Sequence, residues 1–147
     1  MKAKQIKNLK NLKVKFIYRV IVTEYGIDYD LSDTLILTLE DNSIIQILVD
    51  SEIKIYKLSS EEDILILGEY DFKNSIKKLV LIKEIINNEE IANIYNYLQS
   101  TYHFGSKFMN FKNEFIFGFC FGWDEISLLD ENEFNNMLLS YPEHSPF

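Results

Sequence analysis

The chain has one cysteine, Cys120, and two histidines, His103 and His144, which are the first candidates for a thiol nucleophile, its base or a metal ligand. A cysteine nucleophile needs a base within hydrogen-bond reach and electropositive surroundings that lower the pKa of the thiol. Cys120 instead lies between Phe119 and Phe121, and acids follow soon after it. The sequence therefore favours a buried structural thiol over a catalytic one.

Metal chemistry has equally weak support. A single cysteine excludes an intrachain disulfide and a cysteine-based zinc site. The separation of the two histidines fits no helix-face or hairpin pattern of ligands. Asp28, Asp30 and Asp33 form D-x-D-x-x-D within the stretch YGIDYDLSD. That pattern lacks the glycine and the distal glutamate of the twelve-residue calcium loop. We expect no metal and no cofactor, and we interpret these carboxylates as a solvated turn or a partner contact.

A second candidate surface follows the phenylalanine-rich run in FIFGFCFGWDEISLLDENEF, residues 115–134. Trp123, Asp124 and Glu125 come directly after this run. A tryptophan beside two acids at a strand end is typical of an interface anchor with an acidic rim. The alternative is that Trp123 closes the core while the two acids face water.

The charge of the chain is unevenly distributed. The formal net charge is −8, and seven of the fifteen basic residues fall within residues 1–19, which contain no acid. An acidic body repels nucleic acid and attracts basic partners, although net charge also serves solubility. No apolar run approaches the length of a membrane span, and the basic start lacks the apolar segment of a signal peptide. We therefore expect a cytoplasmic protein that binds neither nucleic acid nor membranes.

Alternating apolar residues predict strands over residues 13–24, 34–40, 44–49, 53–58 and 64–67, with residues 25–33 as a turn. Asp41 and Asn42 predict a tight hairpin turn, because both tolerate positive φ. Residues 75–88 fit either a strand or a helix. Residues 87–100 predict a helix whose apolar stripe falls at Ile91, Ile94, Tyr95 and Leu98. Residues 101–113 are expected to form a loop.

The run from Phe115 predicts a core strand with Phe115, Phe117, Phe119 and Phe121 on one face. On the other face, Gly118 and Gly122 leave space for a close neighbour, such as a helix. A second helix is predicted with Asp130 as its N-cap and Glu133 completing a capping box. Its apolar stripe consists of Phe134, Met137, Leu138 and Tyr141.

These elements predict one α+β domain over residues 1–147: a mostly antiparallel sheet of five to seven strands with two helices packed on one face. Residues 1–12 are expected to be a basic lead-in, and residues 142–147 a mobile tail.

The stretches GFCFGWDEISLLDENEF and YGIDYDLSD, in a small acidic domain without a catalytic constellation, resemble the immunity proteins of bacterial polymorphic toxin systems, including contact-dependent growth inhibition. The resemblance implies a protein that is not an enzyme and that blocks one cognate toxin domain, often a basic nuclease, by direct binding. The residues expected to bind this partner are Trp123, Asp124, Glu125, Tyr29, Asp28, Asp30 and Asp33. Two other functions stay open: a small enzyme using Cys120 or carboxylates, and an adaptor that forms homodimers through a strand edge.

Overall fold

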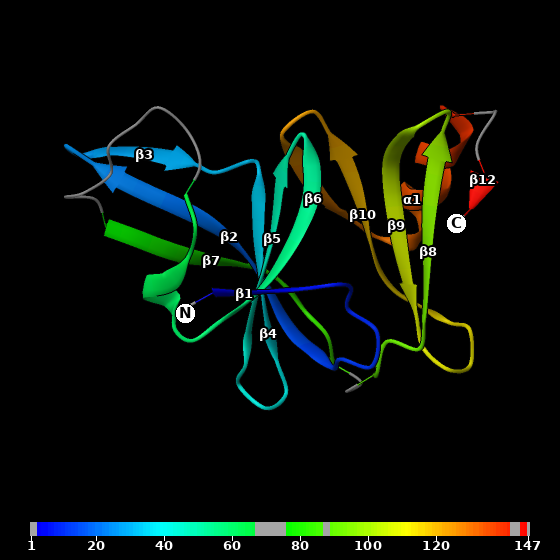
Figure 1. The fold of residues 1–147 in the computed structure, drawn as a ribbon, viewed down its shortest axis with the longest axis horizontal. Helices are drawn as coiled ribbons and strands as arrows, with labels where there is room; N and C mark the ends of the chain where they lie inside the picture. The colour runs from blue at the N-terminus through cyan, green and yellow to red at the C-terminus, as the bar shows by residue number, and fades with distance from the viewer. Residues whose placement is uncertain (1–2, 67–75, 87–88, 142–144, 147) are drawn as a thin grey trace.

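The structure is a computed structural model, and it describes residues 3–66, 76–86, 89–141 and 145–146. Over these residues the chain forms twelve strands, one α-helix, α1 (Glu131–Leu139), and a short 3-10 helix, η1 (Glu61–Asp63). Strands make up 59% of the structure, and only one helix has seven or more residues. The predicted α+β fold with two helices on one sheet is therefore wrong: the fold is mostly antiparallel β-sheet (Figure 1).

The first sheet has seven antiparallel strands and centres on the long strand β2 (Val14–Glu24). Tyr18 of β2 is paired both with Ile36 and with Leu81, so β2 has neighbours on both edges. One edge carries β7 (Ile76–Glu84), and the other carries β4 along its first half and β3 along its second half. The remaining strands extend the sheet beyond β4 in the order β5, β6 and β1, with bounds β1 (Ala3–Ile6), β3 (Ile27–Asp30), β4 (Thr34–Leu39), β5 (Ile44–Asp50) and β6 (Glu52–Leu58).

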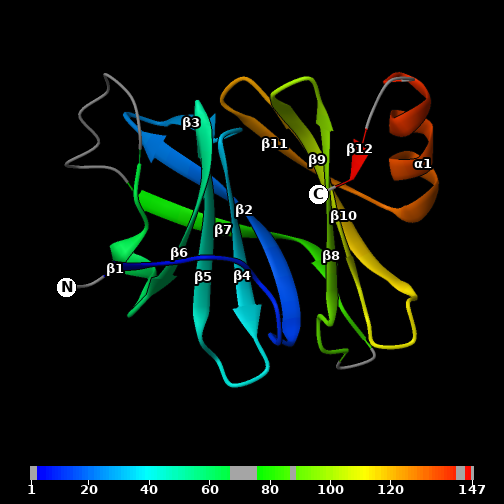
Figure 2. The same ribbon diagram turned by 45° about the vertical axis from the view of Figure 1, so that its right-hand side comes forward.

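The second sheet has five antiparallel strands in the order β11, β10, β9, β8 and β12. Their bounds are β8 (Asn93–Gln99), β9 (Tyr102–Met109), β10 (Phe115–Gly122), β11 (Glu125–Leu129) and β12 (Ser145–Pro146). Figure 2 shows three layers: the first sheet, the second sheet beside it, and α1 on the far side of the second sheet.

The main core lies between the two sheets. Ile17, Leu37 and Ile47 of the first sheet pack in one cluster with Phe117 and Phe119 of the second. Successive side chains of a strand point to opposite faces, so each of these strands turns every second residue, an apolar one, towards the opposite sheet. The expected strands β2, β4, β5, β6 and β10 and the hairpin turn at Asp41–Asn42 are confirmed.

A second cluster forms where α1 covers the outer face of the second sheet. Phe134 is completely buried against Tyr97 and Phe104, with ring centroids of Tyr97 and Phe134 5.6 Å apart. The helix begins as predicted: the Asp130 carboxylate accepts from Glu133 N at 2.8 Å, and the Glu133 carboxylate accepts from Asp130 N at 3.0 Å. This capping box is confirmed. The predicted stripe is confirmed for Phe134, Met137 and Leu138, whereas Tyr141 packs in the same cluster from beyond the end of α1 at Leu139.

Glycine at position 118 allows this close packing. A Cβ added at Gly118 would lie 2.6 Å from Cδ2 of Phe134, and one added at Gly105 would lie 2.7 Å from the Met137 methyl carbon. The expectation that a helix packs against the glycine face of β10 is therefore confirmed at Gly118. At Gly122 the nearest atoms belong to the Glu125 side chain instead.

The expected helix over residues 87–100 is wrong over residues 89–100, and residues 87 and 88 lie outside the described residues. Residues 93–99 form β8, a strand with Ile94 and Asn96 towards the cavity between the sheets and Tyr95 and Tyr97 towards α1. Both faces of this strand are covered, so apolar side chains occur on both faces. Their positions in the sequence then also fit the spacing of an amphipathic helix, which explains the wrong prediction. The expected loop over residues 101–113 is wrong over residues 102–109, which form β9 and pair with both β8 and β10, whereas residues 110–113 form the turn between β9 and β10.

Smaller differences have local causes. A bulge between Phe115 and Phe117 shifts the register with β9, so Phe115 packs with Phe134 in the α1 cluster while Phe117 faces the main core. The four rings therefore do not share one face. The ambiguous stretch 75–88 contains β7, and the expected turn 25–33 contains β3. Within the expected strand 64–67, residues 64–66 have no regular structure, and residue 67 lies outside the described residues.

The outer face of the first sheet is closed by residues 64–66, which one buried amide holds. Gln46 of β5 is fully buried; its Nε2 donates to Leu65 O at 2.8 Å, and its Oε1 accepts from Leu65 N at 2.9 Å. The same Nε2 donates to the hydroxyl of Thr34 at 3.0 Å. Side-chain hydrogen bonds here replace a strand ladder, and Ile64 is buried as a result.

Both ends of the chain contribute strands. Ala3–Ile6 form β1, which pairs with β6, and Leu9 in the basic lead-in is fully buried in the main core. Near the other end, residues 145–146 pair with β8, whereas residues 142–144 and 147 of the expected mobile tail lie outside the described residues.

The close approach at Gly118 gives a direct prediction. We expect Gly118→Ala to reduce the free energy of unfolding by about 1–3 kcal/mol, because the new methyl group overlaps the Phe134 ring and forces α1 outward. Gly122→Ala on the same strand face is the matched control, since its Cβ meets only the flexible Glu125 side chain. Urea unfolding of both variants measures the difference. Equal stability of the two variants would contradict this account of the contact.

Candidate protein-binding surface

Two hairpin tips from different sheets meet at one end of the molecule (Figure 1). The turn between β10 and β11 consists of Trp123 and Asp124, and the turn between β5 and β6 is at Ser51. The Asp124 carboxylate accepts a hydrogen bond from Ser51 N at 3.1 Å. Both Ser51 and Asp124 have positive φ, at 54° and 57°, so each hairpin reverses within very few residues.

We call this end the acidic tip and define it by Asp33, Asp50, Glu52, Trp123, Asp124 and Glu125. Trp123 is 77% exposed, which excludes the alternative that it closes the core. Asp50, Glu52, Asp124 and Glu125 are also exposed, and within the described residues the only ion pair recorded at the tip joins Glu52 to Lys54 at 3.7 Å. The structure thus places a bare indole among carboxylates.

The surroundings of Asp33 disfavour the ionised form of its carboxyl group. Burial raises its pKa above the ordinary value, and the negative charges of Asp124 and Asp50 raise the pKa further, while a hydrogen bond to its own backbone partly opposes the shift. The backbone of the same segment joins the layers: Ile126 N donates to Ser32 O, and Val49 N donates to Asp33 O. Backbone hydrogen bonds therefore hold these carboxylates close together, although their like charges repel one another.

The structure divides the seven residues predicted to bind a partner. Asp33 lies with Trp123, Asp124 and Glu125 at the acidic tip. The other three predicted residues, Asp28, Tyr29 and Asp30, lie on β3. The Asp28 carboxylate accepts a hydrogen bond from the Thr23 hydroxyl at 2.5 Å, and the Asp30 carboxylate lies 3.8 Å from the Arg19 guanidinium. Tyr29 is half-buried opposite Val22. The hydrogen bond of Asp28 and the ion pair of Asp30 are thus both made with residues of β2.

Cys120 does not have the surroundings of a nucleophile. It projects from β10 on the face opposite Phe119 and Phe121 and is half-buried. Burial raises the pKa of its thiol, and the charge of Glu125 raises it further. A thiol of raised pKa supplies less thiolate at neutral pH.

His103 belongs to a polar network that lines a cavity of about 220 Å³ between the two sheets. Its Nε2 lies 2.8 Å from the hydroxyl of Ser106 and 2.9 Å from the carbonyl oxygen of Gly105, and the Ser106 hydroxyl donates to Asn96 Oδ1 at 2.5 Å. Since the serine proton points to Asn96, the imidazole Nε2–H is the donor to serine. A histidine that activates serine must accept that proton instead, so the polarity is opposite to that of a nucleophile pair.

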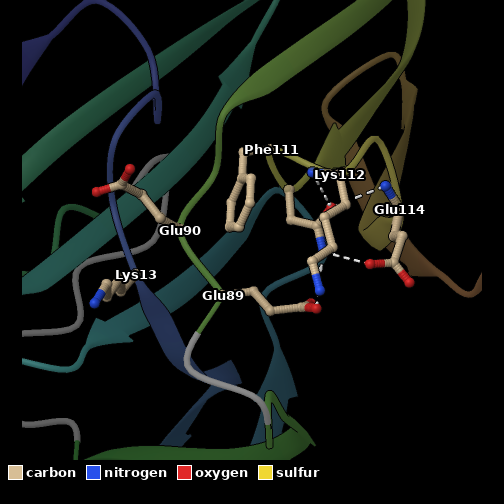
Figure 3. A pocket seen from close by; sticks show the side chains of 7 residues that line it. Lys13, Glu89, Glu90, Phe111, Lys112 and Glu114 are labelled. Carbon is tan, nitrogen blue, oxygen red and sulfur yellow. Dashed lines mark hydrogen bonds between the residues drawn. The ribbon is translucent and has the colours of Figure 1, made fainter.

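A cavity of about 430 Å³ lies at the opposite end of β10 from the acidic tip, beside the turn that joins β9 to β10. Asn110 holds this turn by accepting from Lys112 N and Glu114 N while donating to the Glu89 carboxylate. Figure 3 shows the Phe111 ring among the side chains that line this cavity, and Phe111 is exposed. The wall contains two lysines, Lys13 and Lys112, and three glutamates, Glu89, Glu90 and Glu114, so it presents no dominant sign of charge.

Sequence reasoning did not anticipate several of these features. The Ser106–His103–Asn96 network and the Asn110 turn fall in the segment expected to be a helix and a loop. The signal in the sequence was the presence of polar residues, His103 and Ser106, within an otherwise apolar stretch, because buried polar groups need hydrogen-bond partners. No group of three or more histidine, cysteine, aspartate or glutamate side chains in the described part of the chain could hold a metal ion.

Comparisons of this chain with known protein families, with curated proteins and with solved structures found no match. None of the helices in the described ranges is both long and apolar enough to cross a membrane.

The raised pKa of Asp33 predicts a pH-dependent effect on stability. Because the folded protein holds this proton more tightly than the unfolded chain, ionisation of Asp33 weakens folding as pH rises through the acid range. We expect Asp33→Asn to be more stable than the wild type at neutral pH, with the difference shrinking towards about pH 3, where the carboxyl is protonated. Urea unfolding at both pH values measures this. Glu61→Gln, on the exposed η1, is the control; an equal gain there would contradict a local cause.

The environment of Cys120 predicts slow chemistry. In the folded protein we expect iodoacetamide to label Cys120 at least about tenfold more slowly than in the urea-unfolded chain at the same pH, because burial raises the thiol pKa and limits access. Mass spectrometry of quenched samples measures the rate. Labelling that is faster in the folded protein would support the enzyme alternative.

Proposed function

We propose that this protein binds a basic protein partner through the acidic tip, and that it acts as an immunity protein that inhibits a cognate bacterial toxin. The observation that carries the proposal is the 77% exposure of Trp123 beside carboxylates that repel one another. A large aromatic side chain held in water at a hairpin tip gains most by entering a partner's pocket. On this proposal the protein is not an enzyme and needs no cofactor.

The charges of the tip support a basic partner in particular. Asp50 and Asp124 raise the pKa of Asp33, so part of their interaction energy is unfavourable in the free protein. A lysine or arginine placed among these carboxylates would remove that repulsion and form charge-assisted hydrogen bonds. The partner would therefore gain affinity from two sources, its own contacts and the relief of repulsion in this chain.

The rigidity of the tip supports specific rather than diffuse attraction. The Ser51–Asp124 hydrogen bond and the tight reversals at both turns fix the two hairpins relative to each other. A preorganised surface loses little conformational entropy on binding. Trp123 would act as the anchor, and Glu52 and Glu125 would form an acidic rim around it.

A toxin that is a nuclease would suit this surface, because the lysines and arginines with which it grips phosphates are the groups that these carboxylates would pair with. The acidic tip would then cover the nucleic-acid site or a surface near it. A cytoplasmic location would bring the protein to such a toxin where it acts.

The test is isothermal titration calorimetry with the product of the adjacent open reading frame, in low salt and in physiological salt. We expect Trp123→Ala to weaken binding by at least about 2 kcal/mol, equivalent to about thirtyfold, because it removes the anchor. Glu125→Lys should lower the affinity more strongly at low salt than at high salt, because it reverses a charge on the rim.

A matched control separates the tip from overall charge. Glu61→Lys makes the same charge change on exposed η1 and should leave affinity nearly unchanged. Circular dichroism confirms that each variant is folded. Absence of binding by the intact protein at both salt concentrations, or equal losses for Glu61→Lys and Glu125→Lys, would overturn the proposal.

A further inference from the structure

Strand β7 is the least protected apolar strand among the described residues. Its burial pattern contains no buried residue, and Ile76, Val80, Leu81 and Ile82 are all exposed, Leu81 by 50%. It follows that a run of large aliphatic side chains is in contact with water on a strand whose sequence is typical of an interior position.

One edge of β7 is also open. The strand pairs with β2 from Ile76 to Glu84, and within the described ranges no strand pairs with its other edge. An edge strand of nine residues offers a row of peptide groups that can extend the sheet. Exposed aliphatic side chains and unpaired peptide groups on one strand together indicate a partner strand.

The charges of β7 select the kind of partner. Lys77, Lys78 and Lys83 are the basic residues of the strand, and Glu84 near its end is the one acid. A partner strand must therefore place an acid opposite a lysine and a lysine opposite Glu84. A second copy of the same strand does this when it runs antiparallel in one particular register.

We propose that two copies of this chain pair through β7 in an antiparallel arrangement with Leu81 opposite Leu81, so that one continuous sheet crosses the dimer. In this register Lys78 lies opposite Glu84 of the second copy, and by symmetry the pair occurs twice. Val80 lies opposite Ile82, which joins apolar side chains across the interface. Opposite charges and branched apolar residues are favourable cross-strand pairs.

The neighbouring registers are less favourable. With Val80 opposite Val80, Lys77 lies opposite Lys83 in two places, and like charges directly opposite each other are destabilising. With Ile82 opposite Ile82, Glu84 lies opposite Val80 and loses its lysine. The charge pattern of residues 77–84 therefore selects the register centred on Leu81.

A bulge in β7 limits the length of the pairing. Ile17 of β2 is paired with Lys83 and Tyr18 with Leu81, so Ile82 has no opposite residue on β2. Bulges increase the local twist of a strand. Because Ile82 lies inside the paired segment, residues 78–84 of each copy, the added twist shortens the stretch that can pair regularly, and the dimer dissociates within a measurable concentration range.

This pairing is independent of the acidic tip. β7 lies on the edge of β2 opposite to β3 and β4, whereas the tip is formed by the β5–β6 and β10–β11 turns and Asp33. A dimer would thus carry two acidic tips. Binding of a basic partner and self-association are tested by different variants.

The test is sedimentation equilibrium of the wild type and three charge variants from low micromolar to several hundred micromolar concentration. The wild type should be a monomer–dimer mixture. Lys78→Glu and Glu84→Lys should each raise the dimer dissociation constant at least about tenfold, because each places like charges opposite one another in two places. The double variant Lys78→Glu with Glu84→Lys should return the constant to within a few-fold of the wild type.

Two controls complete the design. Lys10→Glu reverses an exposed charge away from β7 and should leave dimerisation unchanged, and Leu81→Lys should abolish it. Circular dichroism establishes that each variant folds. A wild type that is monomeric at every concentration overturns the proposal, and so does a dimer that the single reversals do not weaken or that the double variant fails to restore.

Discussion

The packing of the second sheet between two layers is the constraint on which the rest of this structure depends. Its inner face meets the first sheet through Phe117 and Phe119, and its outer face meets α1 through Phe134. The contact at Gly118 leaves no room for a side chain, so α1 can approach only where glycine is present. The hairpin turns at both ends of β10 take their positions from this central strand.

The parts of the fold that the sequence could predict are those in which runs of apolar and β-branched residues end at turn residues. Strands β2, β4, β5 and β6 were predicted with nearly correct ends, and Asp41 and Asn42 mark the turn between β4 and β5. In β8 the pattern of Ile94, Tyr95, Tyr97 and Leu98 is compatible with a helix, because both faces are apolar. Only tertiary contacts with α1 and the first sheet distinguish the two structures.

The candidate surface was predicted in part, for a related reason. Trp123, Asp124 and Glu125 follow a strand directly, so the chain itself brings them together. Asp33 joins them through contacts between distant segments, and no local pattern distinguishes it from Asp28 or Asp30. The exposure of β7 was likewise hidden, because its aliphatic run has the composition of a buried strand.

The Ser51–Asp124 hydrogen bond joins turns that belong to different layers. A force that acts on Trp123 is therefore transmitted to both sheets and not to the β10–β11 hairpin alone. Because it crosses from one layer to the other, this bond opposes sliding of the two sheets, and removing the Asp124 side chain would let the two hairpins move independently.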